Sequence, residues 1–316
     1  MKKIVGIMAA VAMTASVFAV DFQAAIKAST NLFGMTFANG AKPTMLEAGL
    51  DSGGAYWGSR LQANIYGDRC SAQFALSYHS WDSLGVQFGL NDYKVTFDPF
   101  AALSVQILNA DDKMNESYTD QKKVMGAAGA WKATIKPVDG LAIDVTLPSK
   151  WMDAGNIGST SVKVGYSADF GTISAMMIAN NNFKAMRLGA GFAGKAGEVA
   201  YFADAAIDVL GSVANLAVDA QADANIDTIN VKAYVLYENS LNNSQSLLLR
   251  AKASMALDGA TAYCEIKDDN LMGPFAMTVN PGVGFKVGGA DLDLGLKLEI
   301  GSAVAVSVPF SASVSF

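Results

Sequence analysis

The stretch at residues 303–316 constrains the fold more than any other part of the sequence. It reads AVAVSVPFSASVSF and ends on an aromatic residue. Apolar side chains hold one parity from Val304 to Phe316, while serine dominates the other. Because successive side chains of a strand point to opposite faces, the pattern predicts a β-strand with one apolar face. Pro309 cannot donate to a ladder, so we expect it at a bulge or facing a gap in the ladder.

The same alternation recurs from Asp21 onward in units of about ten residues. In residues 56–66, for example, Leu61 and Ile65 alternate with Arg60 and Asn64. Comparable segments are 22–32, 70–78, 160–168, 229–237, 247–257 and 292–300. The breaks alternate between short turns, such as Asp258-Gly259, and longer connections such as 33–54 and 109–123.

These units predict an all-β chain that forms a closed antiparallel transmembrane β-barrel. Tight turns at one end and longer loops at the other are typical of outer-membrane barrels, and the breaks indicate about 18 strands, with about 16 as the alternative count. Both chain ends would then lie on the periplasmic side. Outside the first twenty residues, no apolar run is long enough for a membrane-spanning helix.

The alternation alone does not fix the local structure of two segments. The apolar parity changes between Leu90 and Tyr93, which predicts a bulge near Asn91 and Asp92. Residues 198–223 are alanine-rich and are also compatible with a helix. The strict parity from Val199 to Val209 favours strands there.

The first residues predict export. Lys2 and Lys3 precede an apolar stretch from Ile4 to Met13, and small residues follow up to Ala19. This pattern predicts a secretory signal peptide at 1–19 and a single barrel domain at 20–316. Removing the two lysines from 23 basic residues leaves 21 against 29 acidic ones, which moves the formal net charge from −6 to −8. The acidic balance excludes a nucleic-acid-binding function.

Few residues indicate catalysis or metal binding. His79 is the single histidine, and no nucleophile motif accompanies it. We therefore predict that the chain is not an enzyme and has no cofactor. The acidic run Asp111-Asp112 with Glu116 and Asp120 is interpreted as a hydrated external loop, with Ca²⁺ binding as the alternative. Cys70 and Cys264 are expected to be free thiols, because distant strands of a barrel cannot be bridged.

The polar parity indicates the function. If the apolar face contacts lipid, the inward side chains are charged, hydroxyl, amide or glycine, which predicts a water-filled lumen. The predicted basic lining residues are Lys27, Arg60, Lys94, Lys132, Lys136, Lys163, Arg187, Arg250 and Lys252. The predicted acidic lining residues are Glu198, Asp204, Asp208, Asp219, Asp223 and Glu238. We expect the acidic block to face the early basic strands across the lumen, and the net acidic chain to prefer cations weakly.

The terminal strand, with Phe310, Val314 and Phe316 on its apolar parity, resembles the closing strand of bacterial outer-membrane β-barrels. In that family this strand is the signal for the barrel-assembly machinery. From Asp21 to Phe316 the architecture resembles a Gram-negative outer-membrane porin.

The resemblance implies an outer-membrane location in contact with lipid, and passive diffusion of ions and small hydrophilic solutes. It also implies a homotrimer and a loop folded into the lumen, for which residues 109–123 are the candidate. Two alternatives stay open: an adhesin or surface antigen anchored by its barrel, and an exported soluble β protein.

Overall fold

The computed structural model describes residues 19–37, 47–50, 60–80, 86–115, 124–148, 160–180, 184–210, 215–240 and 244–315. Within these ranges every regular element is a strand of one antiparallel sheet. No helix in the described ranges is long and apolar enough to cross a membrane. The strands are β1 (Ala19–Phe37), β2 (Glu47–Leu50), β3 (Arg60–Gly67), β4 (Cys70–Ser80), β5 (Val86–Phe100), β6 (Leu103–Lys113), β7 (Gly126–Val138), β8 (Leu141–Leu147), β9 (Thr160–Ala168), β10 (Gly171–Asn180), β11 (Ala185–Ala196), β12 (Val199–Leu210), β13 (Asn215–Ile226), β14 (Ile229–Ser240), β15 (Ser244–Leu257), β16 (Ala260–Asp268), β17 (Met277–Val287), β18 (Ala290–Gly295), β19 (Lys297–Ile300) and β20 (Val304–Ser315).

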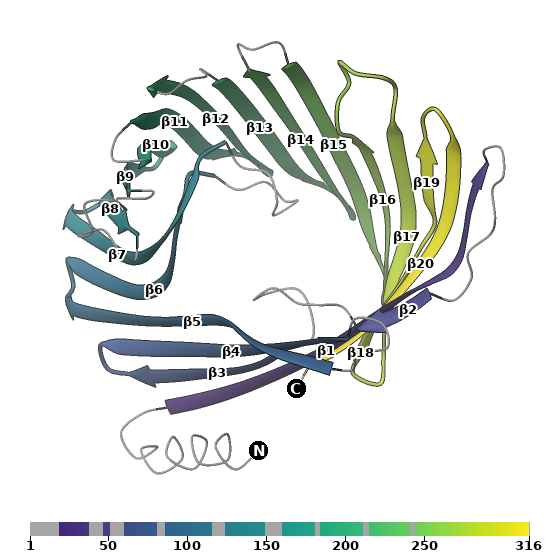
Figure 1. Cartoon of the computed structure of the whole chain (residues 1–316), viewed down its shortest axis with the longest axis horizontal. Helices are drawn as coiled ribbons and strands as arrows, with labels where there is room; N and C mark the ends of the chain where they lie inside the picture. Colours follow the sequence, from purple (N-terminus) through teal and green to yellow (C-terminus); the bar gives the residue numbers. More distant parts are fainter. Residues whose placement is uncertain are drawn as a thin grey trace.

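The sheet closes on itself (Figure 1). Neighbouring strands pair in chain order, and β20 returns to pair with β1 from Ala25↔Ser315 to Phe37↔Val304. Two strand positions are interrupted, because β2 and β3 both pair with β1, and β18 and β19 both pair with β20. The twenty described strands therefore fill eighteen positions around the barrel. The predicted all-β barrel and its strand number are confirmed.

The turns at one end of the barrel are short. Gly140 and Gly259 lie in two of them with φ of 79° and 73°, a left-handed conformation that glycine adopts without strain. Both described chain ends lie at this end, since Ala19 pairs with Tyr66 beside the β3–β4 turn and Ser315 pairs with Ala25. The longer connections lie at the opposite end. This asymmetry was predicted.

The predicted connection at 33–54 is wrong in part, because β1 continues to Phe37 and β2 begins at Glu47. The register of β1 against β20 shifts between Asn31 and Phe33. This bulge reverses the apolar parity and hides the second half of β1 from a search for alternation. Pro309 pairs with Asn31 at the bulge, and on its other side it faces the interruption between β18 and β19. Pro309 therefore lies at a bulge and also faces a gap in the ladder, which were the two predicted alternatives.

The other ambiguous segments also form strands. The shift from Ala75↔Asp92 to Leu76↔Leu90 leaves Asn91 as the extra residue, which confirms the predicted bulge. Residues 199–226 contribute β12 and β13, so strands replace the alternative helix. The predicted loop at 109–123 is wrong at its start, because β6 continues to Lys113.

The two faces of the wall differ in exposure. In β12, Tyr201, Ile207 and Val209 are exposed, whereas Phe202 and Asp204 between them are buried. Four exposed aromatic side chains lie close to the short turns, namely Tyr66, Phe100, Tyr166 and Phe170, while Phe37 and Phe275 are exposed near the opposite end. This distribution is that of an apolar outer band with an aromatic girdle at one interface. Trp131 is also exposed although it lies in the middle of β7.

Several predicted features involve residues or side chains that the structure does not describe. Residues 1–18 and Phe316 lie outside the described residues, so the signal peptide and the terminal assembly signal stay predictions. The side chains of Arg60 and His79 are likewise outside, although both residues belong to strands. Cys70 and Cys264 are free thiols on β4 and β16, as predicted.

Candidate functional site in the barrel lumen

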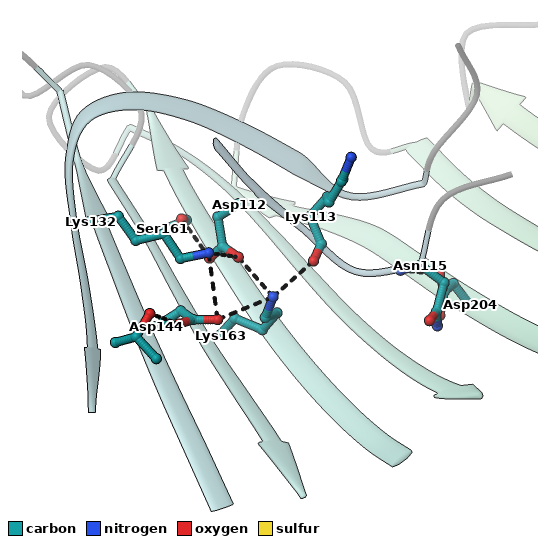
Figure 2. A network of polar contacts seen from close by, with 9 residues as sticks. Asp112, Lys113, Asn115, Lys132, Asp144, Ser161, Lys163 and Asp204 are labelled. Carbon is teal, nitrogen blue, oxygen red and sulfur yellow. Dashed lines mark hydrogen bonds and ion pairs between the residues drawn. The ribbon is translucent and has the colours of Figure 1, made fainter. Parts of the chain in front are cut away.

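The chain just beyond β6 reaches an inward side chain on another part of the barrel wall. The backbone N–H of Asn115 donates to Oδ2 of Asp204 over 3.1 Å, and its side-chain amide donates to Oδ1 over 2.8 Å. Asp204 belongs to β12, several strands away around the ring, and Figure 1 shows the ends of β6 and β7 inside the ring. Figure 2 shows Asn115 against Asp204. The side of each strand that shares a face with Asp204 is therefore the inner side.

β6 contains an irregularity a few residues before Asn115. The pairing of β6 with β7 shifts between Ile107 and Ala110. Leu108, inside this shift, has a φ of 68°, a left-handed conformation that is rare for a branched side chain. Such a backbone persists only where surrounding contacts hold it, and strained residues cluster at functional sites.

Two inward glycines on β11 let Met114 and Met125 approach the wall closely. A Cβ added at Gly189 would lie 2.8 Å from Cγ of Met125. A Cβ at Gly191 would lie 2.7 Å from Cε of Met114 and would collide with Oδ1 of Asp204. The backbone of β11 thus forms a shallow groove, and the two methionines that flank the connection pack into it.

An apolar cluster on the inner wall packs against these methionines. Val124 and Met125 are buried against inward side chains of β10 and of β12 to β15, and Met114 packs at the edge. The inner members are Met176, Ile178, Phe202, Ala206, Ala217, Tyr234, Leu236 and Leu248. The expectation of a uniformly polar inner wall is therefore wrong on this side. These apolar side chains are stabilised on the inner wall because they and the residues Met114, Val124 and Met125 remove one another from water.

Opposite charges meet on the inner faces of β6 to β9 (Figure 2). The ammonium of Lys163 lies 2.8 Å from Oδ1 of Asp112 and 3.2 Å from Oδ2 of Asp144. Lys132 lies 3.4 Å and 3.7 Å from the same two carboxylates. Lys163 also donates to the backbone carbonyl of Lys113 over 2.9 Å, which ties this four-charge cluster to the start of the connection. The assignment of Asp112 to an external loop is wrong, because its side chain is fully buried on the inner wall.

Two carboxylates of the predicted acidic block form ion pairs with cations on adjacent strands. Arg187 on β11 forms an ion pair of 3.0 Å with Asp208 on β12, and Lys232 on β14 forms one of 2.8 Å with Asp223 on β13. Direct register places the members of each pair side by side. These carboxylates are thus largely neutralised by the next strand, before any field across the lumen is considered.

A second polar constellation lies on the inner faces of β15 to β18. The ring of Tyr263 occupies the space that a side chain at Gly282 would take, and its hydroxyl donates to Asp293 over 2.8 Å. The ammonium of Lys252 lies 5.0 Å from the centre of that ring. Beside Asp293 is an open recess of about 540 Å³ with a mixed lining. Its polar residues include Thr261, Lys286, Asp291, Ser311 and Ser313, and its apolar ones include Leu257, Phe285 and Leu292.

At the end of the barrel opposite the short turns, ion pairs hold the β16–β17 connection. Asp269 pairs with Lys267 over 2.8 Å and with Arg250 over 3.4 Å. Burial opposes ionisation of this carboxyl, but the hydrogen bonds and charges of Lys267 and Arg250 outweigh it and lower the pKa of Asp269 below its ordinary value. Arg250, predicted as a lining residue, therefore reaches from the inner wall to this connection.

The remaining predicted lining residues divide into two groups. By register, Lys27, Lys94 and Glu238 share the inner parity of their strands. Glu198 and Lys136 do not lie on the central wall, because Glu198 belongs to the turn before β12 and Lys136 is exposed near the β7–β8 turn. Sequence analysis missed Asn115, Tyr234 and the Tyr263–Asp293 contact. The strict alternation of Asp291 and Asp293 with Leu292 and Leu294 was the available signal for the last of these.

Comparison with known proteins gives a result at the level of structure. No family model matches the chain, and no curated protein matches its sequence. Its structure, however, matches 172 chains. Pseudomonas aeruginosa OccK3 (OpdO) is 10% identical with a TM-score of 0.59, covering 94% of this chain and 96% of that one. The BenF-like porin from Pseudomonas fluorescens Pf-5 is 9% identical with a TM-score of 0.58, covering 94% and 99%.

The fold is that of the bacterial outer-membrane porins. A third structure with this fold, the trimer form of the Vibrio cholerae outer membrane protein OmpT, is 14% identical with a TM-score of 0.52, covering 95% of this chain and 100% of that one. The likeness to these porins runs over nearly the whole described barrel and is a likeness of fold.

Proposed function

We propose that the protein is an outer-membrane channel for the passive diffusion of ions and small hydrophilic solutes. The observation that carries the proposal is the division of one closed wall into an exposed apolar outer face and a charged inner face. A wall of this kind is stable with lipid outside, because the outer side chains lose contact with water and the closed ladder leaves no edge unpaired. The short-turn end, where both described chain ends lie, would face the periplasm.

The residues just beyond β6 and just before β7 would narrow the path, because Asn115 contacts Asp204 and Met125 packs in the apolar cluster. They lie against β10 to β15, whereas the four-charge cluster and the Tyr263–Asp293 recess lie elsewhere on the wall. Charges of both signs along the path keep solutes hydrated and disfavour apolar ones. With the mature chain at a formal charge of −8 once Lys2 and Lys3 are removed, the path would prefer cations weakly.

The associated partners follow from this function. Outer-membrane lipid would contact the apolar face, and the barrel-assembly machinery would insert the chain by its terminal strand, with Phe310 and Val314 on the outward parity beside Phe316. A homotrimer is proposed by analogy with the trimer form of OmpT. No enzymatic role is proposed.

Swelling of liposomes tests the function directly. Proteoliposomes with the refolded barrel should swell in small sugars and amino acids, at rates that fall steeply with solute size. Liposomes that contain a heat-unfolded sample provide the control. Absence of swelling from a folded barrel would favour the anchor alternative, in which the barrel only holds external parts at the surface.

A further inference from the structure

The recess beside Asp293 lies at the short-turn end of the barrel, and the charges on its wall balance. Lys286 forms an ion pair of 3.2 Å with Asp291 across the β17–β18 turn. Asp293 adds a second carboxylate to the lining. Lys27 on the inner parity of β1 adds a second ammonium group to the same row, because Ser313 is the register partner of both Lys27 and Asp291. Two cations and two anions therefore share this part of the wall.

The charges farther along the wall do not upset this balance. Lys252 lies 5.0 Å from the centre of the Tyr263 ring, and its register partner on β16 is Glu265, which has the opposite charge. Asp258 lies in the β15–β16 turn and is exposed, so that salt and water screen its charge. The recess therefore has no strong net field that would select an ion of one sign.

Small side chains give the recess its depth. Thr261, Gly284, Asp293 and Ser311 lie in direct register across β16, β17, β18 and β20. A Cβ at Gly284 would lie 3.6 Å from Oδ2 of Asp293, so the glycine leaves space beside that oxygen, while Oδ1 accepts a hydrogen bond from Tyr263. The recess has a volume of about 540 Å³. Pockets that bind small molecules measure roughly 300–1,000 Å³.

The lining combines donors, acceptors and carbon surface. Its ammonium group donates hydrogen bonds, its carboxylates accept them, and the hydroxyls of Thr261, Ser311 and Ser313 do both. Its apolar residues include Leu257, Phe285 and Leu292. A hydroxyl group of a solute also donates and accepts, so it can bond to any of these polar groups. A sugar carries such hydroxyls around the edge of its ring and C–H groups on its faces, which matches a lining of mixed polarity without net charge.

We propose that this recess is a weak binding site for neutral sugars and related polyols. Asp293, held in place by Tyr263, accepts hydrogen bonds from neighbouring hydroxyls of the solute, and Lys286 and Ser311 bond to others. The role of the site, as a resting place at the periplasmic mouth of the path, rests on the proposed function. Binding itself does not require conduction. It is weak because a site along a diffusion path must release its solute.

Three probes that share one ring test the charge argument, namely glucose, glucosamine and glucuronate. Saturation-transfer NMR on the folded barrel in a sugar-free detergent measures their binding. We expect glucose to bind saturably and, at low ionic strength, at least as tightly as either charged analogue. Absence of saturable glucose binding would overturn the proposal. Clearly tighter binding of glucosamine or glucuronate would also overturn it, because the recess would then be an ion site.

Two substitutions locate the binding in the recess. Gly284→Val fills the space beside Asp293 at a position where a Cβ fits, so it should fold and lose glucose binding. Gly165→Val on β9 is the matched control, because a Cβ at Gly165 meets nothing within 4 Å. Asp293→Asn should weaken glucose binding about tenfold, the difference between a charged and a neutral acceptor. If Asp293→Asn does not fold, Gly284→Val decides alone. Unchanged binding by either folded variant would overturn the proposal.

Conductance measurements separate this inference from the channel function. In planar bilayers, glucose should lower the ion current through the unmodified barrel in a concentration-dependent way, and it should lower the current through Gly284→Val less. A barrel that binds glucose but gives no conductance steps would contradict the channel and leave the binding site intact. Conductance steps from a barrel that shows no glucose binding would support the channel and overturn the site.

Discussion

Arg187 on β11 and Asp208 on β12 are register partners whose side chains form an ion pair of 3.0 Å on the inner wall. Parity alone placed them in two blocks of opposite sign and did not show that they are neighbours. In the structure they are neighbours, and Asn215 on β13 adds a hydrogen bond of 2.8 Å to the same carboxylate. The inner surface is therefore a mosaic of local pairs rather than two facing walls, and the pairs decide which charges a solute meets.

Breaking this pair from either side should shift ion selectivity in opposite directions. Asp208→Asn leaves the guanidinium of Arg187 unpaired and should move the reversal potential in a salt gradient toward anions. Arg187→Gln should move it toward cations, and the double variant should return close to the original value. The shifts should shrink at high salt because of screening. Identical reversal potentials for all variants would show that the pair lies away from the conducting path.

Filling the groove on β11 should displace Met114 and the chain just beyond β6 from the wall. Gly191→Ala places a methyl group against Asp204 and Met114, and overpacking of this kind costs about 1–3 kcal/mol. We expect a lower unfolding midpoint in urea and a larger single-channel conductance. Gly165→Ala on β9 is the matched control, because a Cβ at Gly165 meets nothing within 4 Å. Equal behaviour of the two variants would contradict the packing of the connection on β11.

Removing Lys163 should destabilise the barrel more than removing its buried partner together with it. Lys163→Met leaves Asp112, which is 1% exposed, with a weaker set of cations. Breaking a buried pair from one side costs about 3 kcal/mol. The double variant Asp112→Asn with Lys163→Met should recover much of that loss, as measured by urea unfolding in detergent. Additive losses in this double-mutant cycle would argue against a coupled cluster.

Adjacent residues on opposite faces of β15 should differ in tolerance for charge. Ala253 is exposed on the outer face, and Ser254 lies on the inner face opposite Tyr263. An arginine on the lipid face costs up to about 2–4 kcal/mol at the membrane midplane, whereas an inward one stays hydrated. Ala253→Arg should reduce the folded fraction in lipid vesicles, as seen by gel mobility of unheated samples, and Ser254→Arg should not. Equal folded fractions would mean that the faces are exchanged.

The barrel itself could be predicted from sequence because its physics is local. Alternation along each strand reports two environments, and glycine-rich turns such as Asp258-Gly259 mark where strands end. Local rules also found the extra residue at Asn91. They failed at the end of β1, where the bulge beside Phe33 reverses the parity of a strand that continues.

The lumen was harder to predict because its contacts join residues far apart in the sequence. Nothing near Asn115 indicates that it will meet Asp204, and the inward glycines at 189 and 191 have a reason only once the connection lies against them. Parity assigns a residue to a face but not to a neighbour. It therefore assigned Arg187 and Asp208 to one face and missed that they form an ion pair with each other.

Single-channel recording in planar bilayers tests the central claim, that this barrel is a water-filled path across a membrane. The refolded protein should give discrete, long-lived conductance steps, with Gly191→Ala giving larger steps than Gly165→Ala. A barrel that is folded by gel mobility and by its β-rich spectrum, yet gives no steps at any pH, would contradict the account.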